Sequence, residues 1–344
     1  MKKVLSICLI FLISFSVVFA TGNSEIAEET KDGMSVLVYV TGVVAGSPTY
    51  QMMVEGAEEF QKERENVTLK VYEAGFNQAE WESQLTDLVA TGQYDVVVAS
   101  NPSLPEICQN VAAKFKNQKF IITDAYKEGN SQITTYLYNQ YEQGLLLGYL
   151  AGLVTTGDMK YANPEKKIGF VAAQNYPLLE SHIIPGFLDG ARMVDPDITL
   201  DERIVGNWYD AGKAAELSKS MTDNGVDVFM VIAGGATQGV ITTAEEQGAY
   251  IVLPDTDEYK NSDNIVGCTQ MYQKRMVHEA LCSAYDGTIE YGKATIVGIK
   301  EGYIDFVDDN PLYAKANSET VRAEFDSFLE KIRAGDIDYT TPEL

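Results

Sequence analysis

The sequence predicts two doubly wound α/β lobes, each built on a parallel sheet. Strand-like and helical segments alternate regularly, and the alternation occurs in two consecutive series. The chain of 344 residues is also too long for one hydrophobic core. A late segment returns to both series, so we expect several crossings that join the lobes as a multi-stranded hinge.

The first series starts at residue 34. Runs of β-branched and aromatic residues are expected to be strands, and segments with apolar residues at helical spacing are expected to be helices. The expected strands are 35–40, 67–72, 94–99, 119–124 and 134–137, and the expected helices are 50–61, 78–91, 102–115 and 140–154.

The second series follows a polar linker at residues 155–166. Its expected strands are 167–172, 198–205, 226–232 and 249–253, and its expected helices are 178–194, 211–224 and 237–246. The late segment adds helices at 275–285 and 319–334 and strands at 294–300 and 303–306. We therefore expect lobe 1 at 34–155, completed by about 271–300, and lobe 2 at 156–270, completed by about 301–344.

The first twenty residues have the pattern of a secretory signal peptide. Lys2 and Lys3 precede an apolar run at residues 4–19, and residues 18–20 (Val-Phe-Ala) form a cleavage site. A membrane anchor is the alternative, but it needs about 20 apolar residues. No cysteine ends the run, so a lipobox is absent. We expect a periplasmic or extracytoplasmic protein that begins with a flexible leader at residues 21–33.

The charge balance limits the partners. The chain has 50 acidic and 26 basic residues and a formal net charge of −24. Phosphate recognition needs clustered lysine and arginine, so nucleic acid is not an expected partner. Anionic membrane surfaces are disfavoured for the same reason.

The cysteines and histidines predict no metal site and no disulfide framework. Cys108, Cys268 and Cys282 follow the signal peptide, and an odd number without close spacing favours small apolar core residues. His182 and His278 are far apart and have no neighbouring ligand cluster in the sequence, so both are expected to be structural. We expect neither a metal nor a cofactor.

No catalytic motif is present, so we do not expect an enzyme. Residues 234–239 are rich in glycine and open a helix, but they lack the lysine of a P-loop and do not fit GxGxxG. Gly234 and Gly235 are expected to bring backbone N–H groups close to a ligand. A tight strand-to-helix turn is the alternative.

Two carboxylates follow expected strands. Asp124 ends the strand at 119–124, and Asp255 follows the strand at 249–253. Ligands of parallel α/β sheets bind at the carboxyl ends of the strands, and a carboxylate there accepts hydrogen bonds from hydroxyl or ring N–H groups. A helix cap or a surface acid is the alternative for each.

Two aromatic residues lie in expected loops. Tyr50 follows the turn after the first strand, and Trp208 lies in the polar segment 206–210. One would come from each lobe, so together they are expected to sandwich a flat ligand, each stack contributing about 1–3 kcal/mol by analogy with base stacking. The alternative is that either ring is buried in the core.

The chain resembles the basic membrane protein (BMP) family over nearly its whole length after the leader. The resemblance is carried, in order, by Asp124 and by residues 138–144, 147–152, 167–171, 185–191, 210–213 and 225–228. It implies an extracytoplasmic solute-binding protein with a type I periplasmic-binding-protein fold and an ABC-type permease in the inner membrane as its partner. The ligands that it implies are purine nucleosides or riboflavin. We expect the protein to act as a monomer.

Residue by residue, the resemblance also implies parts of the ligand site. Trp208 stands where nucleoside binders of the family have a stacking phenylalanine, Asp255 where they have a ribose-binding aspartate, and Asp124 at another acid of the cleft. Residues 43–50 replace an aspartate-rich stretch that contacts the purine, and Met271 stands about where a lysine is expected. These departures favour riboflavin, with a purine nucleoside such as inosine or guanosine as the alternative.

Overall fold

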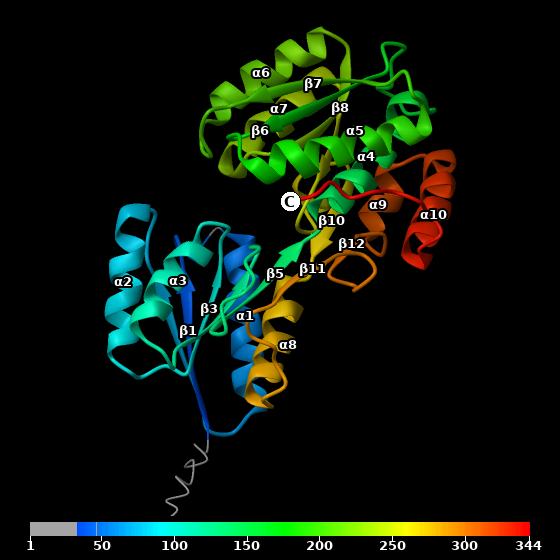
Figure 1. Cartoon of the computed structure of the whole chain (residues 1–344). Coiled ribbons are helices and arrows are strands. Elements are labelled where there is room, and N and C mark those ends of the chain that lie inside the picture. The colour runs from blue at the N-terminus through cyan, green and yellow to red at the C-terminus, as the bar shows by residue number, and fades with distance from the viewer. Residues whose placement is uncertain (1–32, 46) are drawn as a thin grey trace, which may run out of the picture. The chain divides into compact units, whose positions relative to one another are not determined.

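The computed structural model describes residues 33–45 and 47–344. The expected signal peptide, its cleavage site and almost all of the expected leader lie outside these residues. Figure 1 shows the chain coloured along its sequence. No helix in the described part combines the length and apolar character needed to cross a membrane.

The first sheet has six strands, all paired in parallel, in the order β11-β5-β4-β3-β1-β2. Its strands are β1 (Met34–Val40), β2 (Val67–Glu73), β3 (Val96–Ser100), β4 (Lys119–Thr123), β5 (Ile133–Tyr138) and β11 (Ala294–Val297). The late strand β11 joins at the edge, beside β5. The predicted return of the chain to the first sheet is therefore present.

Both faces of this sheet are covered by helices. Alternate residues of β1 point to opposite faces, as the pleat of a strand requires. Val36 and Val38 pack with α1 (Pro48–Glu63) and α8 (Gln273–Tyr285), while Leu37 and Tyr39 pack with α2 (Gln78–Ala90) and α3 (Leu104–Lys114). This explains why the strand is a continuous apolar run rather than an alternating one.

The second sheet has the order β12-β10-β9-β8-β6-β7, with β12 antiparallel and the other pairs parallel. Its strands are β6 (Lys167–Ala172), β7 (Thr199–Ile204), β8 (Val226–Ile232), β9 (Tyr250–Leu253), β10 (Ile265–Met271) and β12 (Ile304–Phe306). Its helices are α4 (Gln140–Thr156), α5 (Ile184–Val194), α6 (Ala211–Asp223), α7 (Thr237–Gln247), α9 (Pro311–Ala316) and α10 (Glu319–Ala334). In strand order the second sheet repeats the first, so the predicted two-lobed, doubly wound fold is confirmed.

Three crossings connect the sheets: β5 to α4, β10 to α8, and β11 to β12. The helix α4 shares one hydrophobic core with α5 and with strands of the second sheet. The lobe boundaries remain a prediction, because residues 33–344 form one compact unit. The packing of α4 favours a first crossing after β5 instead of at residue 155.

α4 and α5 pack unusually closely, through glycines. A Cβ on Gly148 would lie 2.0 Å from the carbonyl oxygen of Phe187, and one on Gly190 would lie 2.2 Å from that of Leu145. Gly144 and Gly186 make similar backbone contacts across the pair. This contact holds α4 in place, and its first turn carries two side chains of the site described next.

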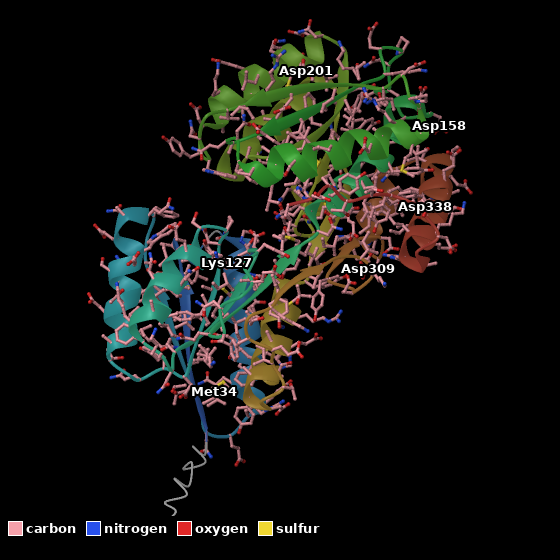
Figure 2. The ribbon with its side chains drawn as sticks, viewed as in Figure 1. Met34, Lys127, Asp158, Asp201, Asp309 and Asp338 are labelled. Carbon is pink, nitrogen blue, oxygen red and sulfur yellow. The ribbon has the colours of Figure 1, made fainter. Side chains whose placement is uncertain are left out.

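The acidic side chains include exposed residues such as Asp158 and Asp309, which are labelled in Figure 2. Charges in such positions stay hydrated, so they add to solubility without determining the fold.

Candidate functional site

A cavity of about 570 Å³ opens at the carboxyl ends of β8 and β9. Its walls come from the first helix, α1, and from the second sheet. Residues 47–49, at the start of α1, lie on one side, and the second sheet contributes its strand ends and the loops that follow them. The second-sheet lining residues are Trp208, Val231, Ile232, Ala233, Gly234, Gly235, Thr237, Gln238, Ile241, Leu253, Pro254, Asp255, Thr256, Glu258 and Asn261. This is the position at which parallel α/β sheets bind ligands.

Trp208 is presented to the cavity by a rigid turn between β7 and α6. Gly206 takes a positive φ of 98°. The Asn207 side chain then accepts hydrogen bonds from the backbone N–H groups of Tyr209 (3.0 Å) and Asp210 (2.8 Å). Asp210 in turn caps α6 by accepting from the N–H of Lys213. The indole remains 43% exposed, which leaves one surface free for a planar ligand.

The glycine pair supports the back of that indole. Gly234 has a φ of +55°, and a Cβ there would lie 3.2 Å from the Trp208 carbonyl oxygen and 3.3 Å from its ring. The N–H of Ala236 donates to the same carbonyl at 3.2 Å. Both glycines line the cavity, while their contact with a ligand stays a prediction, and the absence of a side chain at Gly234 leaves room for Trp208.

Asp255 lies in the cavity wall just after β9. Its φ is +76°, a left-handed conformation that aspartate and asparagine adopt more readily than other non-glycine residues. Its carbonyl oxygen accepts from the N–H of Met271 (3.0 Å), and its Oδ1 accepts from Nε2 of Gln143 (3.1 Å). Burial raises the pKa of this carboxyl against the opposing effect of the Gln143 hydrogen bond.

Asp124 directly follows β4 and has the same left-handed backbone conformation, with a φ of +52°. Its Oδ1 accepts from Nε2 of Gln140 at 3.3 Å. Burial, and secondly the charge of Asp255, raise the pKa of Asp124 to about 7. Asp124 does not line the cavity, but the effect of the Asp255 charge on its pKa means that the two predicted carboxylates lie within electrostatic range of each other.

Tyr50 is not brought to the cavity. Its hydroxyl lies 2.8 Å from the Thr41 hydroxyl and 3.2 Å from the Thr41 carbonyl oxygen, so the ring is tied to the end of β1. Pro48 and Thr49, one and two residues earlier, line the cavity instead. In this structure the two predicted stacking rings therefore do not face a common space, and Trp208 provides the only aromatic surface among the described lining residues.

Several polar groups at the site were not among the predicted residues. Gln140 and Gln143 reach the two carboxylates from the first turn of α4, and both Asp255 and Asp124 act on the pKa of Tyr176, which burial raises. Thr237 and Gln238 come from the start of α7. A signal existed for α4: Glu142 and Gln143 are polar residues inside an otherwise apolar helix, and both are buried.

The lining residues that the structure describes offer hydrogen bonding, one stacking face and apolar contact. They include no histidine, cysteine, lysine or arginine. Carboxylate and amide groups beside an indole can orient a polar, flat ligand. The arrangement is suited to binding a small molecule.

Outside the cavity, the structure places side chains beside His278 that are distant from it in the sequence or one helical turn away. Glu63 and Cys282 lie beside it, and potential ligand atoms of the three residues all lie within 4.8 Å of one another. The separation of Glu63 and His278 in sequence hid this cluster, because the packing of α1 on α8 creates it.

Comparison with known proteins identifies the family. Residues 34–338 match the family model Bmp, described as "ABC transporter substrate-binding protein PnrA-like". A CD4+ T-cell-stimulating antigen of Listeria monocytogenes is 23% identical over 75% of this chain and 74% of its own length. The ABC transporter nucleoside-binding protein BmpA of Lactococcus lactis is 23% identical over 63% of this chain and 64% of its own length.

A solved structure supports the fold independently. An ABC transporter solute-binding protein of Aeropyrum pernix superposes with a TM-score of 0.76 at 21% identity, covering 90% of this chain and 94% of that one. At this identity the likeness is evidence for the fold alone. It agrees with the type I periplasmic-binding-protein architecture described above.

Proposed function

Because the chain belongs to the Bmp family of PnrA-like ABC transporter substrate-binding proteins, we propose that it captures a flat heteroaromatic ligand with a hydroxylated tail and delivers it to an ABC permease. The observation that carries this proposal is the presence of the half-exposed Trp208 indole and the Asp255 carboxylate in one cavity. A large aromatic side chain left open in a concave site is typical of a ligand contact.

The proposed role of each lining residue follows from the chemistry of its side chain. The Trp208 face stacks on the ring, and the apolar side chains of Val231, Ile241 and Leu253 enclose it. Asp255 accepts hydrogen bonds from hydroxyl groups of the tail, since Gln143 already fixes one of its oxygens in position. The cavity's amide and threonine side chains supply further donors and acceptors.

A purine nucleoside is the first candidate ligand. The relative BmpA is named a nucleoside-binding protein, and a nucleoside has both the planar ring and the hydroxylated sugar that this site accommodates. The cavity, at about 570 Å³, lies within the usual range of small-ligand sites of about 300–1,000 Å³.

Riboflavin is the second candidate, favoured by one local feature. Met271, not a lysine, is the residue that hydrogen-bonds to the backbone of Asp255, and its side chain is buried. The described lining residues include no lysine or arginine for the tail to meet, and the wide indole of Trp208 suits a three-ring system. No relative reported above is named for flavin binding, so this candidate rests on the site alone.

Calorimetry with inosine, guanosine and riboflavin decides between the candidates. Trp208→Ala should weaken binding of the true ligand by roughly 5- to 150-fold, which corresponds to about 1–3 kcal/mol. Tyr209→Ala is the matched control, because Tyr209 is the next residue, is 80% exposed and does not line the cavity. Equal weakening by both substitutions would contradict the role of Trp208, and no binding of any of the three compounds would contradict the ligand class.

Fluorescence provides a second readout. The chain has two tryptophans, and Trp81 is buried, with its indole N–H donating to the Gly75 carbonyl. A ligand stacked on Trp208 should quench part of the emission. That quenching should disappear in Trp208→Phe while the Trp81 emission remains.

We further propose that the protein works outside the cytoplasm, as a monomer and without enzymatic activity. Cleavage after Ala20 should leave a chain that begins at Thr21, which intact-mass measurement of protein from the cell envelope tests. A retained leader or an added lipid mass would contradict this. Recovery of a chemically altered ligand after incubation would contradict the absence of activity.

A further inference from the structure

A cluster of three different metal-binding side chains lies where α1 packs on α8. Glu63 is the last residue of α1, and His278 and Cys282 are four residues apart on α8, hence on one face of that helix. Figure 1 shows the two helices side by side, to the right of β1 and β3 of the first sheet. None of the three residues lines the cavity at β8 and β9.

The ligand atoms are close to the spacing that a tetrahedral ion requires. Nε2 of His278 lies 2.8 Å from a carboxylate oxygen of Glu63 and 3.8 Å from Sγ of Cys282. Bonds of about 2.0–2.3 Å to a zinc ion would set neighbouring ligand atoms roughly 3.3–3.7 Å apart. The three potential ligand atoms lie within 4.8 Å of one another, so rotation of the side chains about their χ angles is the change that metal binding requires.

The backbone fixes the two helices at this distance. A Cβ on Gly56 would lie 2.3 Å from the carbonyl oxygen of Lys274, so the helices touch there without an intervening side chain. Glu63 lies two turns beyond Gly56 on α1, and His278 and Cys282 lie one and two turns beyond Lys274 on α8. The close contact therefore brings the three side chains together further along both helices.

One cationic group already contacts the cluster. The Arg64 guanidinium lies 3.6 Å from Glu63 and donates to Sγ of Cys282 at 3.5 Å. Arg64 has other contacts to retain, since its guanidinium lies 5.9 Å from the rings of both Phe60 and Tyr285. A bound ion would replace the contacts of the Arg64 guanidinium with Glu63 and Cys282, while the contacts of Arg64 with the two rings remain.

We propose that Glu63, His278 and Cys282 bind a zinc ion, with water as the fourth ligand, and that the ion clamps α1 to α8. Thiolate, imidazole and carboxylate are the three side-chain ligand types that zinc accepts in a tetrahedral site. Calcium and magnesium prefer all-oxygen sites, so they are not expected there. Because the three residues belong to one helix pair away from the cavity, the site is independent of the ligand that the cavity binds.

Cobalt titration of the reduced protein tests the proposal directly. Co²⁺ should bind with one equivalent and produce a near-ultraviolet thiolate-to-cobalt charge-transfer band, which Zn²⁺ should abolish by displacement. Cys282→Ser should remove the band, and His278→Gln and Glu63→Gln should each weaken zinc binding at least tenfold. Glu58→Gln on α1 and Cys268→Ala in the second sheet are the controls and should leave binding unchanged.

Thermal unfolding gives the second measurement. Zinc at a hundredfold excess over its Kd should raise the Tm of the parent protein by about 4 °C, and should not raise the Tm of Cys282→Ser. The same Tm without metal in both proteins would show that the serine variant folds. Equal zinc affinity in the parent and in Cys282→Ser, or a charge-transfer band that survives that substitution, would overturn the proposal and indicate binding by surface carboxylates only.

Discussion

Asp124 and Asp255 occupy equivalent places in the two sheets. β4 and β9 are each the third strand of their sheet, counted from β11 and from β12, and each strand is followed by one of these aspartates with a positive φ. Gln140 and Gln143, three residues apart on α4, each donate to one of the two carboxylates. One helix thus holds two acids that belong to different sheets.

The pKa of Asp124 makes stability depend on pH. Its folded-state value of about 7 lies above the ordinary 3.8, so folding favours the protonated acid. The corresponding stability is present below pH 3.8 and is lost as the pH rises through 7. Asp124→Asn keeps a residue that tolerates positive φ and cannot ionise, so its free energy of unfolding relative to the parent should rise by about 1–3 kcal/mol between pH 5 and pH 8.

Urea unfolding of both proteins at the two pH values measures this difference. The other titratable groups that act with Asp124, namely Asp255, Tyr138 and Tyr176, are present in both proteins and largely cancel. If the difference in the free energy of unfolding between variant and parent does not change with pH, Asp124 is ionised in the folded protein throughout this range.

The conformation of Asp255 predicts a second result. Asp255→Ala and Asp255→Gly both remove the carboxylate, but only alanine meets the steric penalty of a φ of +76°. The glycine variant should therefore be more stable than the alanine variant by about 1 kcal/mol in urea unfolding at the same pH. Greater stability of the alanine variant would mean that the loop changes its backbone conformation when the carboxylate is lost.

The support behind Trp208 predicts a contrast between adjacent glycines. A methyl group on Gly234 would need a φ of +55° and would meet the Trp208 ring at 3.3 Å, so Gly234→Ala should displace the indole. Gly235→Ala meets only ordinary contact, with the Trp208 carbonyl oxygen at 3.4 Å. We expect Gly234→Ala to weaken ligand binding at least fivefold and Gly235→Ala to change it less than twofold, as measured by calorimetry. Equal affinities of the two variants would contradict a positioning role for Gly234.

The sequence predicted the fold well because its strands are buried on both faces. Apolar runs such as residues 120–122 and 228–232 stand out between polar helices, and the two-lobed architecture and the family are confirmed. The strand β10 was missed, since Gly267, Thr269 and Gln270 break up its apolar run although it lies inside the second sheet. The neighbouring strands of the sheet bury β10, and the local sequence of β10 carries no information about those strands.

The candidate site was predictable in part. Asp124 and Asp255 were predicted because each follows a strand of its own parallel sheet, where ligands bind. Asp255 lines the cavity and Asp124 does not. Tyr50 was expected in a loop, but it lies in the first turn of α1, where its hydroxyl contacts Thr41 and its ring does not line the cavity. The His278–Cys282 spacing was visible in the sequence, whereas Glu63 joins them only through helix packing.

The contact between α4 and α5 gives the last prediction. A methyl group on Gly148 would lie 2.0 Å from the carbonyl oxygen of Phe187, an overlap with backbone that a side-chain rotation cannot relieve. Gly148→Ala should therefore lower the free energy of unfolding by about 2–3 kcal/mol or more. Because the displaced α4 also carries Gln140 and Gln143, ligand affinity should fall as well.

The matched control is Gly212→Ala in α6. A methyl group there meets only the Asp210 carboxylate at 3.5 Å, which is ordinary contact, and alanine favours a helix over glycine. This variant should be neutral or more stable by up to about 1 kcal/mol in urea unfolding, with unchanged ligand affinity. Similar stabilities of the two variants would show that α4 can move away from α5 at little cost. In that case the glutamines of α4 would not be held rigidly against the two carboxylates, and their hydrogen bonds would have to form on ligand binding.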